Sequence, residues 1–313
     1  MVPDRTDDAN GVIGLSTETA VERILAADAT RDCDEVRSVL AHVTTDDRVT
    51  REEIDATVSD VSKRIATAET RAELARSAFE SARSASAAVG DLDVVADRFD
   101  RYETTLDDIE TRVPELGAEL QHVSNPDDDP DTVYEAVSTL RQIASCADDV
   151  QRTADELQFD LEDFEAWLGS HERRRRAFEE DVDVVADALD SARAATEDLD
   201  EETWVAASLR IELVPVFVSD FRAELDELRV MAARDDVDDG WDAAFEDRLD
   251  ELESRAVTVR STLEKAGDTG WRETHRERIA AFERAVDGIE PPIEWRTVYA
   301  ELERARALAE PYP

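Results

Sequence analysis

The most suggestive set of chemically active residues in the chain is an acidic run that matches part of a calcium-binding loop. Asp235, Asp239, Gly240 and Glu246 stand at the first, fifth, sixth and twelfth positions of a helix-loop-helix calcium loop. Val237 stands at the third position, where its side chain offers no oxygen to a cation. The run therefore favours an acidic turn, in which Gly240 supplies a backbone with positive φ, over a metal site.

The second candidate is a run of four arginines, Arg173–Arg176. Such a run can hold a phosphate or an acidic partner. Acids within helical reach favour pairing inside the helix instead, namely Glu172, Glu179, Glu180 and Asp181. Arg175 is the exception, because it falls with His171 on an apolar heptad series, where a polar pair sets register or partner choice. The candidate partner or register positions are therefore His171, Arg173, Arg174, Arg175 and Arg176.

Catalytic and cofactor-binding patterns are missing from the rest of the sequence. His42, His122, His171 and His275 are far apart, and none belongs to an HExxH-like cluster. The sequence has neither a GxSxG nucleophile elbow nor a GxxxxGKS phosphate loop. Cys33 and Cys146 lack metal-ligand spacing and are expected to be reduced, structural thiols. We predict no cofactor, no metal and no enzymatic activity.

The charge balance is extreme. The 313 residues include 79 acids and 36 bases, which gives a net charge of -43, and only Lys63 and Lys265 among the bases are lysines. Such a surface repels itself unless concentrated salt shortens the screening length, which is roughly 3 Å at about 1 M salt. The composition is typical of a cytoplasmic protein from an extreme halophile. It disfavours binding to duplex nucleic acid, which requires a basic face, and to anionic membranes.

Neither a leader nor a membrane anchor is predicted. The first residues, MVPDRTDDANGVIG, are polar and acidic, unlike a signal peptide. No apolar run approaches the roughly 18 residues that span a bilayer. We therefore expect a cytoplasmic protein without membrane insertion.

Heptad patterns predict the elements that position these residues. Apolar residues recur at alternating steps of four and three from Ile54 to Ala82, and again from Val95 to Val123. Thr50, with Glu53 three residues on, forms a capping box that starts the first series. Two such series joined by a short break predict a long antiparallel hairpin. The fold class is all-α, with elongated hairpins or a bundle along heptad seams and a small helical unit at the N-terminus.

The sequence divides at its turn signals into six segments: a flexible tail (1–15), a small helical unit with Ser16 as N-cap (16–49), the hairpin (50–124), a break (125–130), long bundle helices (131–234) and C-terminal helices (235–313). Pro114 and Pro215 are expected to kink their helices. Gly169 is expected to bend a heptad rod without ending it.

Three stretches resemble a family of haloarchaeal proteins known as halo transducer proteins. They are VTREEIDATVSDVSKRIATAETRAEL (Val49 to Leu74), DLDVVAD (Asp91 to Asp97) and ADELQFDLEDFEAWL (Ala154 to Leu168). The resemblance implies likeness to the coiled-coil cytoplasmic part of sensory transducers, and hence signal relay. The sequence departs from such transducers because it lacks membrane helices and the hairpin tip that couples to a kinase.

These observations predict a non-enzymatic scaffold or signalling adaptor that binds another protein, or itself, through its helical seams. Two alternatives stay open. One is an enzyme with a site assembled from dispersed carboxylates and histidines, and the other is a regulatory nucleic-acid module that uses the N-terminal helices.

Overall fold

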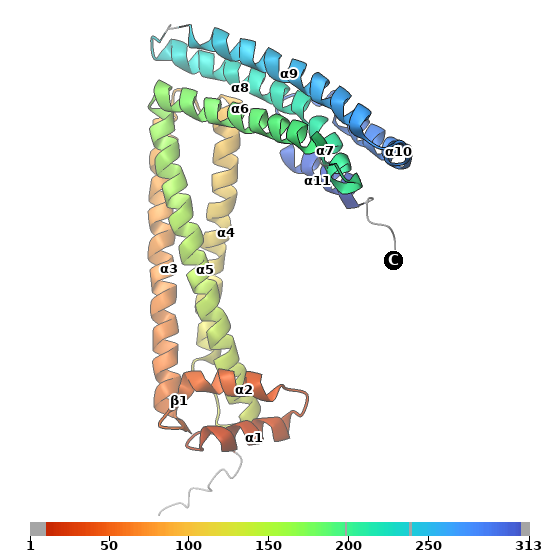
Figure 1. Cartoon of the computed structure of the whole chain (residues 1–313). Coiled ribbons are helices and arrows are strands. Elements are labelled where there is room, and N and C mark those ends of the chain that lie inside the picture. Colours follow the sequence, from red (N-terminus) through yellow and green to blue (C-terminus); the bar gives the residue numbers. More distant parts are fainter. Residues whose placement is uncertain (1–10, 198, 238–239, 308–313) are drawn as a thin grey trace, which may run out of the picture. The chain divides into compact units, whose positions relative to one another are not determined.

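The computed structural model describes residues 11–197, 199–237 and 240–307, and it is all-α apart from one short hairpin (Figure 1). By Cα proximity the chain forms two compact units. The first unit holds the described residues up to Ala85 together with 98–165, and the second holds 86–97 with the described residues from Ala166 on. This division falls inside the helices around residues 97 and 165, whereas the sequence boundaries were placed at turns.

The first unit begins with two short helices, α1 (Thr17–Ala27) and α2 (Cys33–Leu40), and a 3-10 turn, η1 (Ala41–Val43). Ser16 caps α1 by accepting a hydrogen bond from the Thr19 amide, as its position predicts. The strands β1 (Thr44–Thr45) and β2 (Arg48–Val49) follow, within the segment 16–49 that was predicted to be a helical unit. Asp46 and Asp47 both have positive φ, which is the backbone of a tight hairpin turn whose twist matches its strands.

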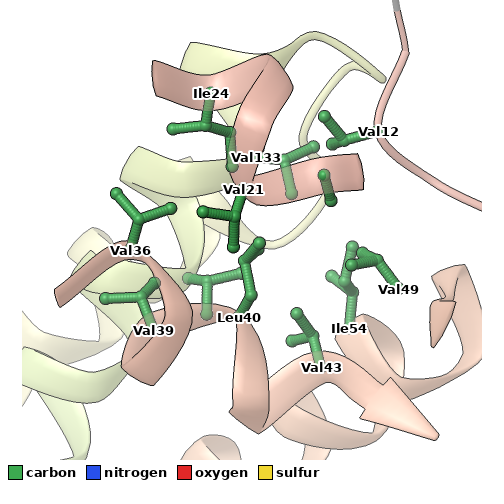
Figure 2. Close-up of a cluster of buried hydrophobic side chains, with 12 residues drawn as sticks. Val12, Val21, Ile24, Val36, Val39, Leu40, Val43, Val49, Ile54 and Val133 are labelled. Atoms are coloured by element: carbon green, nitrogen blue, oxygen red, sulfur yellow. The ribbon is translucent and has the colours of Figure 1, made fainter. Parts of the chain in front are cut away.

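A closed apolar core joins these short elements to two of the long helices. Ile54 comes from the helix that follows the hairpin, and Val133 comes from a helix that begins 79 residues later (Figure 2). Val137 of that later helix belongs to the same core. Val12 is also buried in this core, and its amide donates to Asp128 Oδ1 over 2.7 Å. Residues 11–15 therefore belong to the core region rather than to a free tail, and residues 1–10 lie outside the described part.

Three long helices complete the first unit: α3 (Arg51–Ala85), α4 (Asp93–Val123) and α5 (Pro130–Leu168). The α3–α4 pair confirms the predicted antiparallel packing, with Arg76 of α3 paired to Glu110 of α4. Pro114 lies inside α4. The Thr50 hydroxyl accepts a hydrogen bond from the Glu53 amide at 3.2 Å, so the predicted N-cap of α3 is in place. The Glu53 carboxylate, however, accepts from the Thr45 hydroxyl.

The helices α3 and α5 run parallel in a fixed register. Arg64 pairs with Asp148, Arg71 with Asp155, and the Ser81 hydroxyl donates to Glu165. In each case the partners are 84 residues apart, which is a whole number of heptads. The ion pairs therefore repeat at heptad intervals along the flank of the two parallel helices.

The second unit contains the remaining helices: α6 (His171–Ala194), η2 (Ala195–Glu197), α7 (Glu201–Ile211), α8 (Val214–Arg234), α9 (Trp241–Ala266), α10 (Thr269–Val286) and α11 (Trp295–Ala307). Here α6 and α9 run parallel, because Arg248 meets Asp183 and Arg255 meets Asp190, each 65 residues apart. Phe178 anchors this packing, with its ring 5.1 Å from that of Phe245 on α9.

The structure corrects two expectations about helix breaks. The rod expected to continue past Gly169 ends at Leu168, and a new helix starts at His171, where the Ser170 hydroxyl accepts from the Arg173 amide. Pro215 does not kink one long helix. The chain forms two helices, α7 and α8, and Pro215 lies in the first turn of α8, where its missing N–H leaves no helical bond unmade.

No helix among the described residues is both long enough and apolar enough to cross a membrane.

Candidate functional site

Arg174 is the buried member of the predicted arginine run, with only 2% of its surface exposed. Its Nη1 donates to the carbonyl oxygens of Trp167 at 3.2 Å and Leu168 at 2.7 Å, which end α5. Its Nη2 pairs with Asp235, the C-cap of α8. The carbonyls at a helix end lack intrahelical partners and carry partial negative charge. A guanidinium there donates hydrogen bonds to them and offsets that charge.

This burial corrects the expectation for Arg175. The heptad series through Gly169 placed Arg175 on the seam, but in the structure Arg175 is exposed and Arg174 lies four residues before the buried Phe178. The reason is the break at Gly169 and Ser170. The new helix packs against α8 and α9, and only its first turn departs from the predicted series, because Phe178, Val182, Val185 and Leu189 are buried as the series predicts.

His171 lies close to Arg174 along α6. The His171 ring is half-buried and packs edge-on against Trp241, with ring centroids 5.3 Å apart. Its Nε2 is shielded from solvent and has no hydrogen-bond partner. Arg173, Arg175 and Arg176 are exposed, and Arg176 pairs with Glu172 one turn earlier. The predicted residues thus divide into two groups. His171 and Arg174 contact neighbouring helices, whereas Arg173, Arg175 and Arg176 lie on the exposed face of α6.

Two acids of the run that resembles a calcium loop form ion pairs with arginines. Asp235 pairs with Arg174, and Glu246 accepts from Arg229 at 2.9 Å. Gly240 has the expected positive φ of 66°. Asp239 lies outside the described residues. Among the residues that are described, no three acidic, histidine or cysteine side chains come together as metal ligands.

A second polar cluster, which the sequence did not reveal, lies where α7, α9 and α10 meet. His275 Nε2 and Glu201 Oε1 are 2.6 Å apart, and the His275 ring is almost fully buried. Beside it the Trp204 indole donates from Nε1 to the Leu263 carbonyl oxygen at 2.9 Å. Gly267 lets the indole approach, because a Cβ there would lie 2.5 Å from Trp204 Nε1.

Glu212 occupies the corner between α7 and α8. Its side chain is 7% exposed and pairs with Arg260 of α9. Burial raises the pKa of Glu212 to about 7, the positive charge of Arg260 lowers it, and the nearby carboxylates of Glu283 and Glu264 raise it further. The group therefore changes charge near neutral pH. The sequence held one signal of this site, since Glu212 is the one charged residue between Ile211 and Val218.

The most exposed aromatic feature is on the first unit, one helical turn beyond the Arg71–Asp155 pair. Leu74 follows Arg71 by three residues on α3, and Phe159 follows Asp155 by four on α5. The fixed register of these parallel helices therefore puts Leu74 and Phe159 on the same side of the pair. They are 42% and 65% exposed. We call these two residues and the helix surface between them the Leu74–Phe159 surface.

Comparison with protein-family models, with curated proteins and with solved structures finds no match for this chain. The resemblance to halo transducer proteins stays a prediction.

Proposed function

We propose that the protein is a non-catalytic helical scaffold, or signalling adaptor, that binds another protein through the Leu74–Phe159 surface. The observation that carries this proposal is the exposure of Phe159 in a chain whose surface is otherwise strongly acidic. Single exposed apolar residues are ordinary, but a phenylalanine and a leucine on the same side of a helix pair can form the kind of centre that protein interfaces use.

The rim of the surface indicates the chemistry of the partner. Four exposed acids surround its apolar centre: Glu73, Asp160, Glu162 and Asp163. An apolar centre with a charged rim favours a partner that presents an apolar side chain flanked by arginines. A helix with such residues at spacings of three and four could present them to both α3 and α5. Concentrated salt weakens the rim contacts, so the apolar centre would supply most of the affinity.

Affinity capture from the native cytosol at native salt tests this function. The bait is the full chain, and the Phe159→Ser variant is compared with Val257→Ser. Val257 is the matched control, because it is 66% exposed and lies on α9 in the other unit. We expect one protein to be captured by the wild-type chain and by Val257→Ser, and to be lost with Phe159→Ser. Equal capture by both variants, or a monomer that captures nothing, would contradict the proposal.

A further inference from the structure

Arg278 on α10 carries a positive charge that no side chain among the described residues meets with a hydrogen bond. His275 precedes it by three residues and Phe282 follows it by four, and both are buried, so Arg278 lies on the inner face of the helix. The Arg278 side chain is half-buried, but its Nε, Nη1 and Nη2 are each shielded from solvent and have no hydrogen-bond partner within the described part of the chain. A guanidinium has five N–H donors, and all of them are unused here.

The neighbouring acid is engaged elsewhere. Glu201 is the carboxylate whose charge opposes the lowering of the Arg278 pKa by burial. Its Oε1, however, is bonded to His275 Nε2 at 2.6 Å. Arg174, the other inward arginine of this unit, has carbonyl acceptors and Asp235. A guanidinium whose nitrogens are shielded from water and lack such acceptors is unfavourable, so an added anion is a simple completion of the site.

We propose that Arg278 binds a small anion where α10 packs against α7 and α11. A guanidinium offers two parallel N–H groups, which match the two oxygens of a carboxylate, and formate is the smallest carboxylate that fits this fork. A halide could take the same donors without using the fork. The His275–Glu201 pair borders the site, and Glu201 is half-exposed, so movement of the Glu201 side chain gives an anion a way in.

The test measures thermal unfolding of the full chain while sodium formate replaces sodium methanesulfonate at constant ionic strength. The methyl group makes methanesulfonate too bulky for so closely packed a position. Arg278→Met is compared with Arg276→Met, which removes the same charge from the exposed side of the same helix. In wild type and Arg276→Met, we expect the Tm to rise by about 5 °C at a hundredfold excess of formate over its Kd. In Arg278→Met the rise should vanish.

The same comparison has a second expected result. Without formate, Arg278→Met should unfold at a higher temperature than wild type, because the uncompensated buried charge is gone. Parallel Tm curves for all three proteins would overturn the proposal. So would an Arg278→Met variant that is less stable than wild type at every formate concentration, since that would mean that the guanidinium already has its acceptors within the fold.

Direct binding is measured by the NMR line width of ¹³C-formate and by ³⁵Cl relaxation, which need only a folded wild-type chain. Arg278→Lys keeps the charge but removes the fork. If the ligand is a carboxylate, this variant should weaken formate binding at least tenfold while leaving chloride little changed. If it is a halide, both proteins should broaden the chloride signal equally. No broadening of either signal in wild type would refute the site.

Discussion

Arg174 and Asp235 link the ends of three helices. Arg174 lies in the first turn of α6, its Nη1 donates to the last carbonyls of α5, and its Nη2 pairs with Asp235 at the end of α8. The carboxylate of Asp235 would by itself be unfavourable at a helix C-terminus, where the backbone is already partly negative. The guanidinium offsets that charge, so this contact stabilises α5, α6 and α8 together.

Replacement of Arg174 by Ala should therefore be costly. The change leaves two helix-end carbonyls without a donor and opens a cavity in a packed site, and we expect a loss of about 2–4 kcal/mol in the free energy of unfolding. Arg175→Ala, one residue away and exposed, should change stability by less than about 0.5 kcal/mol. Urea denaturation in concentrated salt, followed by circular dichroism, measures both. If Arg174→Ala and Arg175→Ala lost the same free energy of unfolding, the four arginines would act only through their total charge.

The neighbouring residues show how far the sequence could take the prediction of this site. The alternation of four and three was correct for each long helix, because it reflects one buried face. It could not show that the helix ends at Leu168, since the buried residues of α6 from Phe178 on continue the same series beyond the break. Ser170 offered the competing signal, that of an N-cap. The His275–Glu201 pair had no local signal, because its members are 74 residues apart and only tertiary packing brings them together.

Gly267→Ala should destabilise the second unit. The φ of Gly267 is -62°, so alanine meets no backbone strain there, but its Cβ would lie 2.5 Å from Trp204 Nε1. The indole must move away from the Leu263 carbonyl oxygen, at an expected cost of about 1–3 kcal/mol. Gly117→Ala is the control, because no described atom outside its neighbouring residues and the adjacent backbone of its own helix lies within 4 Å of its Cβ position. Alanine in that helix should add up to about 1 kcal/mol of stability.

The Gly267 result is read from urea denaturation monitored by tryptophan emission. A red shift of the native emission in Gly267→Ala would report that the indole has become exposed to water. If Gly267→Ala were as stable as Gly117→Ala, the close approach of Trp204 would not be a feature of the native state.

Glu212 should make stability fall as the pH rises toward neutrality. Its pKa is about 7 in the fold and 4.5 in the unfolded chain, so the folded state binds the extra proton between these values. The unfavourable contribution of the buried charge is absent below pH 4.5, grows as the pH rises, and is complete above about pH 7. Glu212→Gln removes it, and should be more stable than wild type above pH 7 by about 1–3 kcal/mol.

The control for Glu212 is Glu264→Gln, an exposed acid whose charge acts on Glu212 and whose replacement changes the net charge by the same amount. Urea denaturation at a series of pH values, at constant salt, compares the three proteins. The gap between Glu212→Gln and wild type should close as the pH falls toward 5, whereas Glu264→Gln should show only a small gain above pH 7, because it removes one of the charges that raise the Glu212 pKa. A gap that does not depend on pH would mean that Glu212 keeps an ordinary pKa.

Reversing the charges between α3 and α5 should reveal what these pairs do for register. Each exposed pair is worth only about 0.2–1 kcal/mol, yet Arg64–Asp148 and Arg71–Asp155 repeat at a heptad interval and match in one alignment of the helices. Changing Arg64 and Arg71 to Asp sets acid against acid, and we expect a loss of about 1–2 kcal/mol. Adding Asp148→Arg and Asp155→Arg should restore most of it, because the pairs reform with opposite sense.

Arg152→Asp is the control for this reversal, since Arg152 pairs with Asp149 on its own helix and meets no carboxylate of α3. Thermal unfolding at two salt concentrations distinguishes register from net charge. The loss of stability in the double variant (Arg64 and Arg71 to Asp) should shrink as salt rises, because exposed charges are screened. The quadruple variant, which adds Asp148→Arg and Asp155→Arg, should recover stability at both salt concentrations. If the quadruple variant fails to recover it while Arg152→Asp is neutral, the alignment of α3 and α5 depends on their apolar seam rather than on the ion pairs beside it.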